Sequence, residues 1–284
     1  MASTTRALAR VPGIPRRIRR NVRTVMLLRN WMEFFRSDLS RGELASLRTR
    51  GGIVLEARRG ANLKYLFHEI WLDRVYSPRG YEIRPGDVVI DIGANIGVFS
   101  SFAASSAPGT RILAYEPFPD SAACLRSNLR ASGLENVTVF EQAVCSGPGH
   151  RALSTESGNW VMHTLASRSA GVDAGVHGAR LDQAVEVECV GLDDVFEDNH
   201  VSLCNLLKVD CEGSEYEIFE ACSQATLDRI ERVVVEYHEG AAFVGTGRQL
   251  RDLLVARGFH VDRFIAAGST GYICARARRS GDAG

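Results

Sequence analysis

Short apolar runs alternate with amphipathic segments along most of the chain. The apolar runs are rich in Val, Ile and Leu, which is typical of strands in the middle of a parallel sheet. They lie at 88–90, 111–115, 137–144, 185–190, 206–210, 232–237, 258–265 and 271–277. Segments with helical spacing separate most of these runs, at 96–103, 119–133, 214–226 and 246–257. This alternation predicts an α/β fold with a doubly wound, mostly parallel sheet.

The two ends of the pattern and one internal segment depart from this alternation. The last two apolar runs are joined by AAGST with no helix between them, so we expect a C-terminal hairpin with one antiparallel strand. Upstream of the sheet, a possible strand at 53–57 and an amphipathic helix at 62–71 predict a cap over 53–80. The segment 146–184 is rich in Gly, Ser and Ala and has weak periodicity, which favours a long loop acting as a lid.

Composition restricts the class of protein. The chain has 284 residues, of which 45% are hydrophobic and 24% charged, as expected of a soluble globular protein. No apolar run approaches the roughly 20 residues of a membrane span. The seven cysteines include no C-x-x-C pair, which favours a reducing cytoplasm and argues against a zinc cage or a disulfide framework. Arg greatly outnumbers Lys, and with the many Ala and Gly this suggests a bacterial source.

The net charge of zero conceals a basic N-terminus. Eight arginines precede the first acidic residue, Glu33. An anionic surface, a nucleic acid or an acidic partner would suit such a segment, but charge runs are more often solvated, so we expect no nucleic-acid partner. The sequence therefore predicts a basic N-terminal arm over 1–52, with a helix near 22–35, and one sheet domain over 53–284.

The first predicted strand of the sheet ends in a glycine-spaced turn. The stretch GDVVIDIGANIGVFSSFAA, 86–104, passes from a buried strand into a helix through Gly93, Asn95 and Gly97, and such a turn presents backbone N–H groups to a ligand. The dinucleotide fingerprint G-x-G-x-x-G fails because Asn95 stands at its second glycine, and Asp91 would repel a pyrophosphate. A ligand with a cationic amine or a ribose would not be repelled, so Asp91, Gly93, Asn95 and Gly97 are candidate cofactor contacts. The pattern D-x-G-x-N-x-G resembles the first motif of the Rossmann-like S-adenosylmethionine (SAM) methyltransferases.

The carboxyl ends of the other predicted strands supply further candidate ligands, because bound molecules collect there in such sheets. Glu116 follows the second strand, where a carboxylate can accept both hydroxyls of a ribose. Phe118 could face an adenine, and Gln142 could reach its edge. Asp210 ends the fourth strand and completes this candidate cofactor site.

Five stretches together resemble one methyltransferase family. VIDIGANIGVFS, YEPFPDSAACLRSNL, GLDDVFEDN, LLKVDCEGSEYEIFEAC and VVVEYHEG are similar, in order and spacing, to the FkbM family, from about Glu69 to the C-terminus. The resemblance implies a seven-stranded sheet, SAM as cofactor, S-adenosylhomocysteine as product, and O-methylation of a sugar or secondary metabolite. It does not identify the small-molecule acceptor.

Direct transfer to a hydroxyl requires a base that removes the proton. His238 is our first candidate, with Asp210 or Glu236 orienting its imidazole or serving in its place. Glu212, near the same strand ends, is a candidate acceptor contact, and the predicted lid contributes three more: Asn159, Trp160 and His163.

Several alternatives stay open at this stage. Two clustered carboxylates and a histidine, Asp210, Glu236 and His238, would also suit Mg²⁺, although no metal is expected. The protein could instead methylate an amine, or bind SAM without catalysing a reaction. The absence of the G-x-G-x-x-G fingerprint argues against a dinucleotide enzyme.

Overall fold

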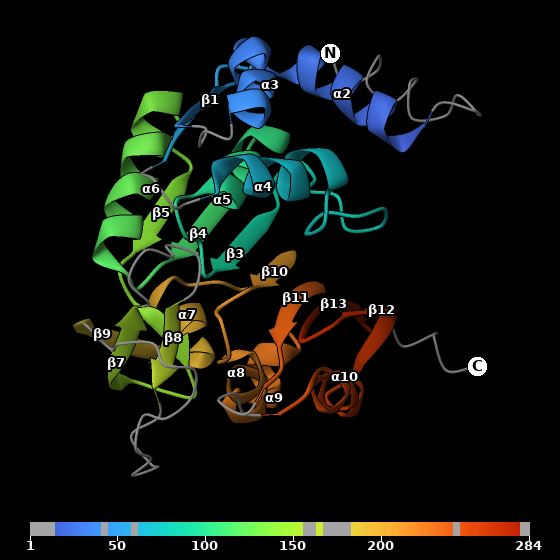
Figure 1. Ribbon diagram of the computed structural model, residues 1–284. Coiled ribbons are helices and arrows are strands. Elements are labelled where there is room, and N and C mark those ends of the chain that lie inside the picture. The colour runs from blue at the N-terminus through green and yellow to red at the C-terminus, as the bar shows by residue number, and fades with distance from the viewer. Residues whose placement is uncertain are drawn as a thin grey trace.

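A seven-stranded sheet forms the centre of the molecule (Figure 1). The computed structural model describes residues 15–40, 45–57, 62–155, 163–166, 183–240 and 245–278. The strand order is β12-β13-β11-β10-β3-β4-β5. Six strands run in one direction, and β13 is antiparallel to both of its neighbours, β11 and β12. The bounds are β3 Val88–Ile92, β4 Arg111–Tyr115, β5 Val137–Phe140, β10 Leu206–Val209, β11 Arg232–His238, β12 Phe259–Ala267 and β13 Thr270–Ala277. The predicted mostly parallel sheet and its C-terminal hairpin are confirmed.

Helices cover both faces of this sheet (Figure 1). Side chains that alternate along a strand point to opposite faces. Ile90 therefore packs with the helices α7 to α10, and Val89 packs with α5 and the cap. The small residue Ala114 lies under α6. The bounds are α5 Val98–Ser106, α6 Pro119–Ser132, α7 Leu192–Asp198, α8 Glu215–Ala221, α9 Gln224–Leu227 and α10 Gly247–Ala256.

Two predicted elements are each divided in the structure. The apolar run 137–144 is not one strand, because β5 ends at Phe140 and β6, Ala143–Cys145, joins a second sheet. That sheet has the order β6-β9-β7-β8, with β7 Gly149–Thr155, β8 His163–Ala166 and β9 Gln183–Gly191, so the run 185–190 also lies outside the main sheet. The predicted helix 214–226 breaks at Ser223, whose hydroxyl accepts from the Thr226 N–H and caps α9.

The described part of the segment 146–184 is more regular than a loop. Residues 149–155 form β7, which pairs antiparallel with both β8 and β9. The remainder of the predicted lid, 156–162 and 167–182, lies outside the described residues.

The N-terminal segment packs onto the sheet domain. It comprises α2 Arg16–Leu27, α3 Trp31–Ser40 and β1 Ser46–Arg48, and β1 pairs with β2, Val54–Glu56. Leu28, Phe34 and Leu47 are buried in the same core as Val89. From Pro15 onward the segment is thus not the solvated arm that its charge suggested, because apolar residues spaced between the arginines bury against the cap. The cap helix is α4, Leu63–Phe67, continued by the π-helix η1, His68–Asp73.

None of the helices among the described residues is long and apolar enough to cross a membrane.

Candidate active site

A pocket lies beside the carboxyl ends of β3, β4, β10 and β11, under the cap helix. Half of the residues predicted to form a site line it: Gly93, Asn95, Glu116, Gln142, Asp210, Glu212 and Glu236. The cap helix and the turn after it add three polar residues that sequence reasoning missed: Tyr65, Glu69 and Tyr76. The pocket therefore joins the predicted glycine turn to the acidic strand ends.

The glycine turn is fixed by a close approach of two chain segments. Gly93 has a φ of 75°, and a Cβ there would lie 1.7 Å from the carbonyl oxygen of Asp210. Asn95 is also left-handed, with a φ of 50°. Gly97, with a φ of 84°, leads into α5 and packs against Leu125 rather than lining the pocket. Only glycine fits at Gly93 without strain, which keeps the backbone of the turn open to a ligand.

Glu116 is positioned by the turn that it faces. Its carboxylate accepts the N–H of Asn95 at 2.7 Å and the N–H of Phe118 at 2.9 Å. Burial raises the pKa of Glu116 to about 7. Phe118 does not line the pocket and packs instead against the small cluster of buried residues on the second sheet. A carboxylate held in this way can still accept hydroxyl donors from the pocket.

Asp91 has a different place from the one predicted for it. Its side chain is 0% exposed, and its carboxylate contacts Lys208 Nζ at 3.0 Å and accepts the Ser100 hydroxyl at 2.5 Å. Lys208 Nζ also donates to the carbonyl oxygen of Gly93 at 2.6 Å. Burial opposes the charge of Lys208, but Asp91 and Asp210 outweigh it and raise the Lys208 pKa above its usual value. Asp91 is therefore placed to hold the lysine and the turn rather than to touch a ligand.

Tyr76 connects the two carboxyl groups at the strand ends. Its hydroxyl lies 2.9 Å from Asp210 Oδ2 and 2.5 Å from Glu236 Oε2. Burial and the charge of Asp210 raise the pKa of Glu236 to about 8. A hydroxyl has one proton to donate, so the arrangement is satisfied when protonated Glu236 donates to Tyr76 and Tyr76 donates to Asp210. Near neutral pH this pair of carboxyl groups then retains one proton.

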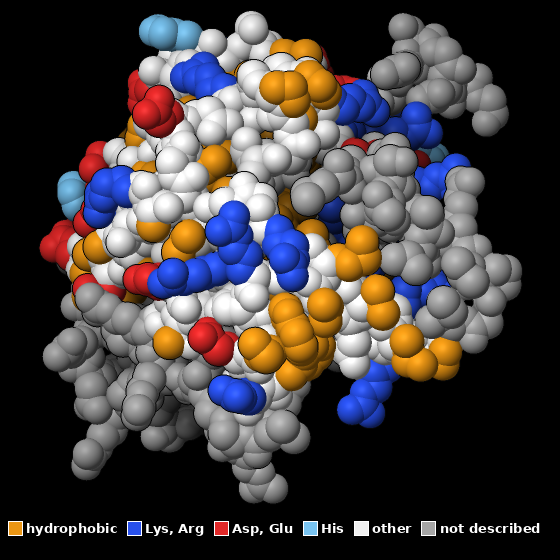
Figure 2. Space-filling view, turned by 90° about the horizontal axis from the view of Figure 1, so that it is seen from above, with side chains coloured by type: hydrophobic (Ala, Val, Ile, Leu, Met, Phe, Trp, Pro, Cys, Tyr) orange, Lys and Arg blue, Asp and Glu red, His pale blue; other side chains and the backbone are white. Residues whose placement is uncertain are grey.

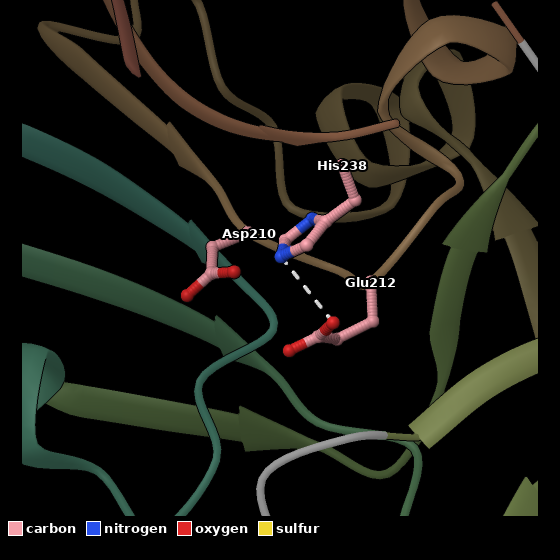
Figure 3. A group of neighbouring side chains, drawn as sticks. All are labelled: Asp210, Glu212 and His238. Atoms are coloured by element: carbon pink, nitrogen blue, oxygen red, sulfur yellow. Dashed lines mark ion pairs between the residues drawn. The ribbon is translucent and has the colours of Figure 1, made fainter. Parts of the chain in front are cut away.

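His238 lies between Glu212, which Figure 3 shows beside it, and Glu215. Its Nδ1 is 2.9 Å from Glu215 Oε1, and its Nε2 is 3.3 Å from Glu212 Oε2. Burial opposes the imidazolium charge, but the hydrogen bond to Glu215 and the charge of Glu212 outweigh it and raise the pKa of His238 to about 10. A histidine that is protonated at neutral pH has no lone pair for a proton. This geometry opposes the expected role of His238 as general base and favours the carboxylates that lie beside it at the strand ends.

Three of these side chains could together hold a cation. Asp210, Glu212 and His238 point toward one another, and one ligand atom from each lies within 4.8 Å of the others (Figure 3). The sequence pointed to Asp210, Glu236 and His238 as possible ligands, whereas the structure replaces Glu236 by Glu212.

Glu69 lines the pocket on the side of the cap helix and is held there by two tyrosines. Glu69 Oε1 accepts the hydroxyls of Tyr272 at 2.6 Å and Tyr65 at 3.1 Å, and burial raises its pKa. Of the predicted acceptor contacts, Asn159 and Trp160 lie outside the described residues, and only the backbone of His163, at the start of β8, is described. Tyr65 and Glu69 lie on the polar side of an amphipathic helix, so periodicity alone predicts them to face solvent.

Comparisons with known proteins point to methyl transfer. The family model for the methyltransferase FkbM domain matches residues 91–261. The chain is 32% identical to the 31-O-demethyl-FK506 methyltransferase FkbM of Streptomyces tacrolimicus over 76% of this chain and 89% of that protein. It is 29% identical to the hexuronic acid methyltransferase AglP of Haloferax volcanii, over 56% and 59% of the two chains. Among solved structures, the magnesium protoporphyrin IX methyltransferase of Synechocystis with bound SAM aligns over 76% of this chain and 82% of that chain, with a TM-score of 0.44 and 11% identity. The segment matched by the family model includes the glycine turn, Glu116, Asp210 and His238.

Proposed function

Because the chain belongs to the FkbM methyltransferase family, we propose that it uses SAM to methylate a hydroxyl of a sugar or secondary metabolite by direct SN2 transfer. The observation that carries this proposal is that Glu116 and the glycine turn line the same pocket as the Asp210–Tyr76–Glu236 group. The names of two relatives support the acceptor class, since one refers to an O-demethyl substrate and the other to a hexuronic acid.

The cofactor end of the pocket is assigned to the first two strands. Glu116 accepts the ribose hydroxyls, the backbone from Gly93 to Asn95 contacts the methionine part, and Gln142 lies at the adenine edge. Lys208 and Asp91 hold the turn in place from behind. When bound, SAM supplies an electrophilic methyl group and leaves as S-adenosylhomocysteine.

The proton of the acceptor hydroxyl is assigned to Asp210. The acceptor oxygen forms the new bond to the methyl carbon as the bond from carbon to sulfur breaks, and the hydroxyl proton passes to the carboxylate. Asp210 lines the pocket, and its side chain is 24% exposed. Tyr76 and protonated Glu236 orient this carboxylate, while the charged His238 balances Glu212 and Glu215.

Substitution of Asp210 tests this assignment. Asp210→Asn keeps the shape of the side chain but removes the base, so methyl transfer should fall by roughly 10² to 10⁴ while SAM affinity changes by less than about tenfold. The measurement is the transfer of a labelled methyl group from SAM to small molecules extracted from the source organism. Glu220→Gln, an exposed change on α8, is the matched control. An Asp210→Asn protein that keeps most of its activity would refute Asp210 as the base.

The same extract also distinguishes the acceptor atom. Mass spectrometry and NMR of the labelled product identify a methyl ether or an N-methyl group. An N-methylated product would show that the acceptor is an amine. No labelled product from a protein that binds SAM would favour a module without catalysis.

A metal-assisted reaction is the second candidate, and the convergence of Asp210, Glu212 and His238 favours it. We expect methyl transfer to be unchanged after dialysis against EDTA, because Glu212 already faces the Nε2 atom of His238 at 3.3 Å. Activity that is lost on chelation and restored by Mg²⁺ or Mn²⁺, but not by Ca²⁺, would instead make these three residues a metal site.

A further inference from the structure

The helix α2 carries its charge and its apolar residues on different sides. It spans Arg16–Leu27, contains five arginines and has no acidic residue. Arg23 donates to the carbonyl oxygen of Leu72 at 2.6 Å, and Arg20 lies 3.6 Å from Asp73. The side that bears Arg20 and Arg23 therefore faces the end of the cap helix.

An apolar stripe lies on another side of the same helix. Ile18, Val22, Val25 and Met26 follow the spacing i, i+4, i+7 and i+8, which places them on one stripe. Ile18 is 53% exposed and Val22 is 39% exposed, while Val25 and Met26 are half-buried. Figure 2 looks onto this end of the molecule and shows hydrophobic side chains next to Lys and Arg side chains. An apolar stripe turned outward is unusual for a helix that packs on a domain.

We propose that α2 docks the protein onto the surface of a membrane that contains anionic lipids, lying in the plane of the interface. A helix with an apolar stripe and arginines beside it has the two features that such binding requires. Arg17 is exposed beside Ile18, and Arg29 is exposed just after the helix, so positive charge lies near both ends of the stripe. The absence of acidic residues in α2 favours anionic over zwitterionic lipid. The exposed Ile18 and Val22 favour lipid over a nucleic acid, which would be contacted by charge alone.

Docking in this way would bring the cap close to the lipid. The arginines of α2 contact the end of η1, through the hydrogen bond to Leu72 and the ion pair with Asp73. The cap helix in turn lines the pocket with Tyr65 and Glu69. The pocket would then lie one helix away from the surface, which suits an acceptor that is itself held in or on a membrane.

Sedimentation with vesicles tests the proposal without an acceptor or activity. The full chain is mixed with vesicles of phosphatidylcholine alone, or of phosphatidylcholine with about one quarter phosphatidylglycerol. We expect at least about tenfold stronger binding to the anionic vesicles, reduced severalfold when NaCl is raised from about 0.1 to 0.5 M. The double variant Ile18→Ser/Val22→Ser should lose most of this binding, and Arg17→Glu should weaken it.

The controls separate docking from a general effect of exposed apolar residues. Ile265, 51% exposed on β12, matches Ile18 in size and exposure, so Ile265→Ser should bind like the wild type. Equal thermal midpoints confirm that the variants are folded. Binding by Ile18→Ser/Val22→Ser that equals the wild type, or no wild-type binding to anionic vesicles, overturns the proposal. Sedimentation velocity is run alongside, and a dimer abolished by the double variant would assign the stripe to a second copy instead.

Discussion

At the scale of single residues, the chemistry of the pocket depends on contacts between distant parts of the chain. Glu116 and Asp210 can be predicted because they follow strands whose carboxyl ends meet at one edge of a parallel sheet. The position of His238 follows the same rule, but its charge is set by Glu212 and Glu215, which no local pattern orients toward it. Tyr76 is missed because it reaches Glu236 across 160 positions of sequence.

The raised pKa of Glu236 predicts how the stability of the protein depends on pH. Its pKa in the folded chain, about 8, lies above the usual value of 4.5, so its contribution to stability is fully present below pH 4.5 and is lost as the pH rises through 8. Glu236→Gln is permanently neutral and removes this loss. The difference in unfolding free energy between the variant and the wild type should therefore change in favour of the variant, by roughly 1 to 3 kcal/mol, when the pH is raised from 5 to 9. Urea denaturation at both values measures the difference.

The matched control for this measurement is Glu220→Gln, since Glu220 is exposed. Its difference from the wild type should be the same at both pH values. If the Glu236→Gln difference were also independent of pH, the carboxyl group would ionise normally and the proposed shared proton with Asp210 would be wrong.

At the scale of elements, the hydrophobic pattern predicts the strands better than their ends or partners. The run 137–144 is apolar throughout, so nothing local indicates that it leaves the main sheet after Phe140. The break between α8 and α9 is marked only by Ser223, whose capping bond depends on the turn that forms. The N-terminal helices are predicted as solvated because their arginines dominate the composition, whereas their packing depends on a few apolar residues.

The prediction at this scale concerns Phe34, the side chain that packs α3 against the cap helix. It is 1% exposed, lies 5.8 Å from the ring of Phe67, and has Lys64 Nζ 4.4 Å from its centroid. Phe34→Ala should lower the unfolding free energy by roughly 3 to 5 kcal/mol. Denaturant titration measures the loss, and Met32→Ala, at a 57% exposed position of the same helix, should change little. Equal stabilities of the two variants would show that α3 does not dock as described.

At the scale of the whole molecule, the proposed cofactor-binding residues and the proposed base lie at the same edge of the sheet. The first two strands bring the glycine turn and Glu116, and the fourth and fifth bring Asp210 and Glu236. Gly93 joins these two groups of residues, since its backbone lies against that of Asp210. The alternation of strands and helices predicts this arrangement from sequence. The cap is predicted as an element, but its closure over the pocket and the tyrosines that it places there depend on tertiary packing and could not be predicted.

The central claim is that this pocket binds SAM through Glu116, and calorimetry with the purified chain tests it most directly. The wild type should bind one SAM and show no binding of NAD. Glu116→Ala should weaken SAM binding by roughly 1 to 3 kcal/mol, because the ribose hydroxyls lose their acceptor. Glu135→Ala, at an exposed position, should bind like the wild type. Unchanged SAM affinity in a folded Glu116→Ala protein, or binding of NAD in place of SAM by the wild type, would contradict the account.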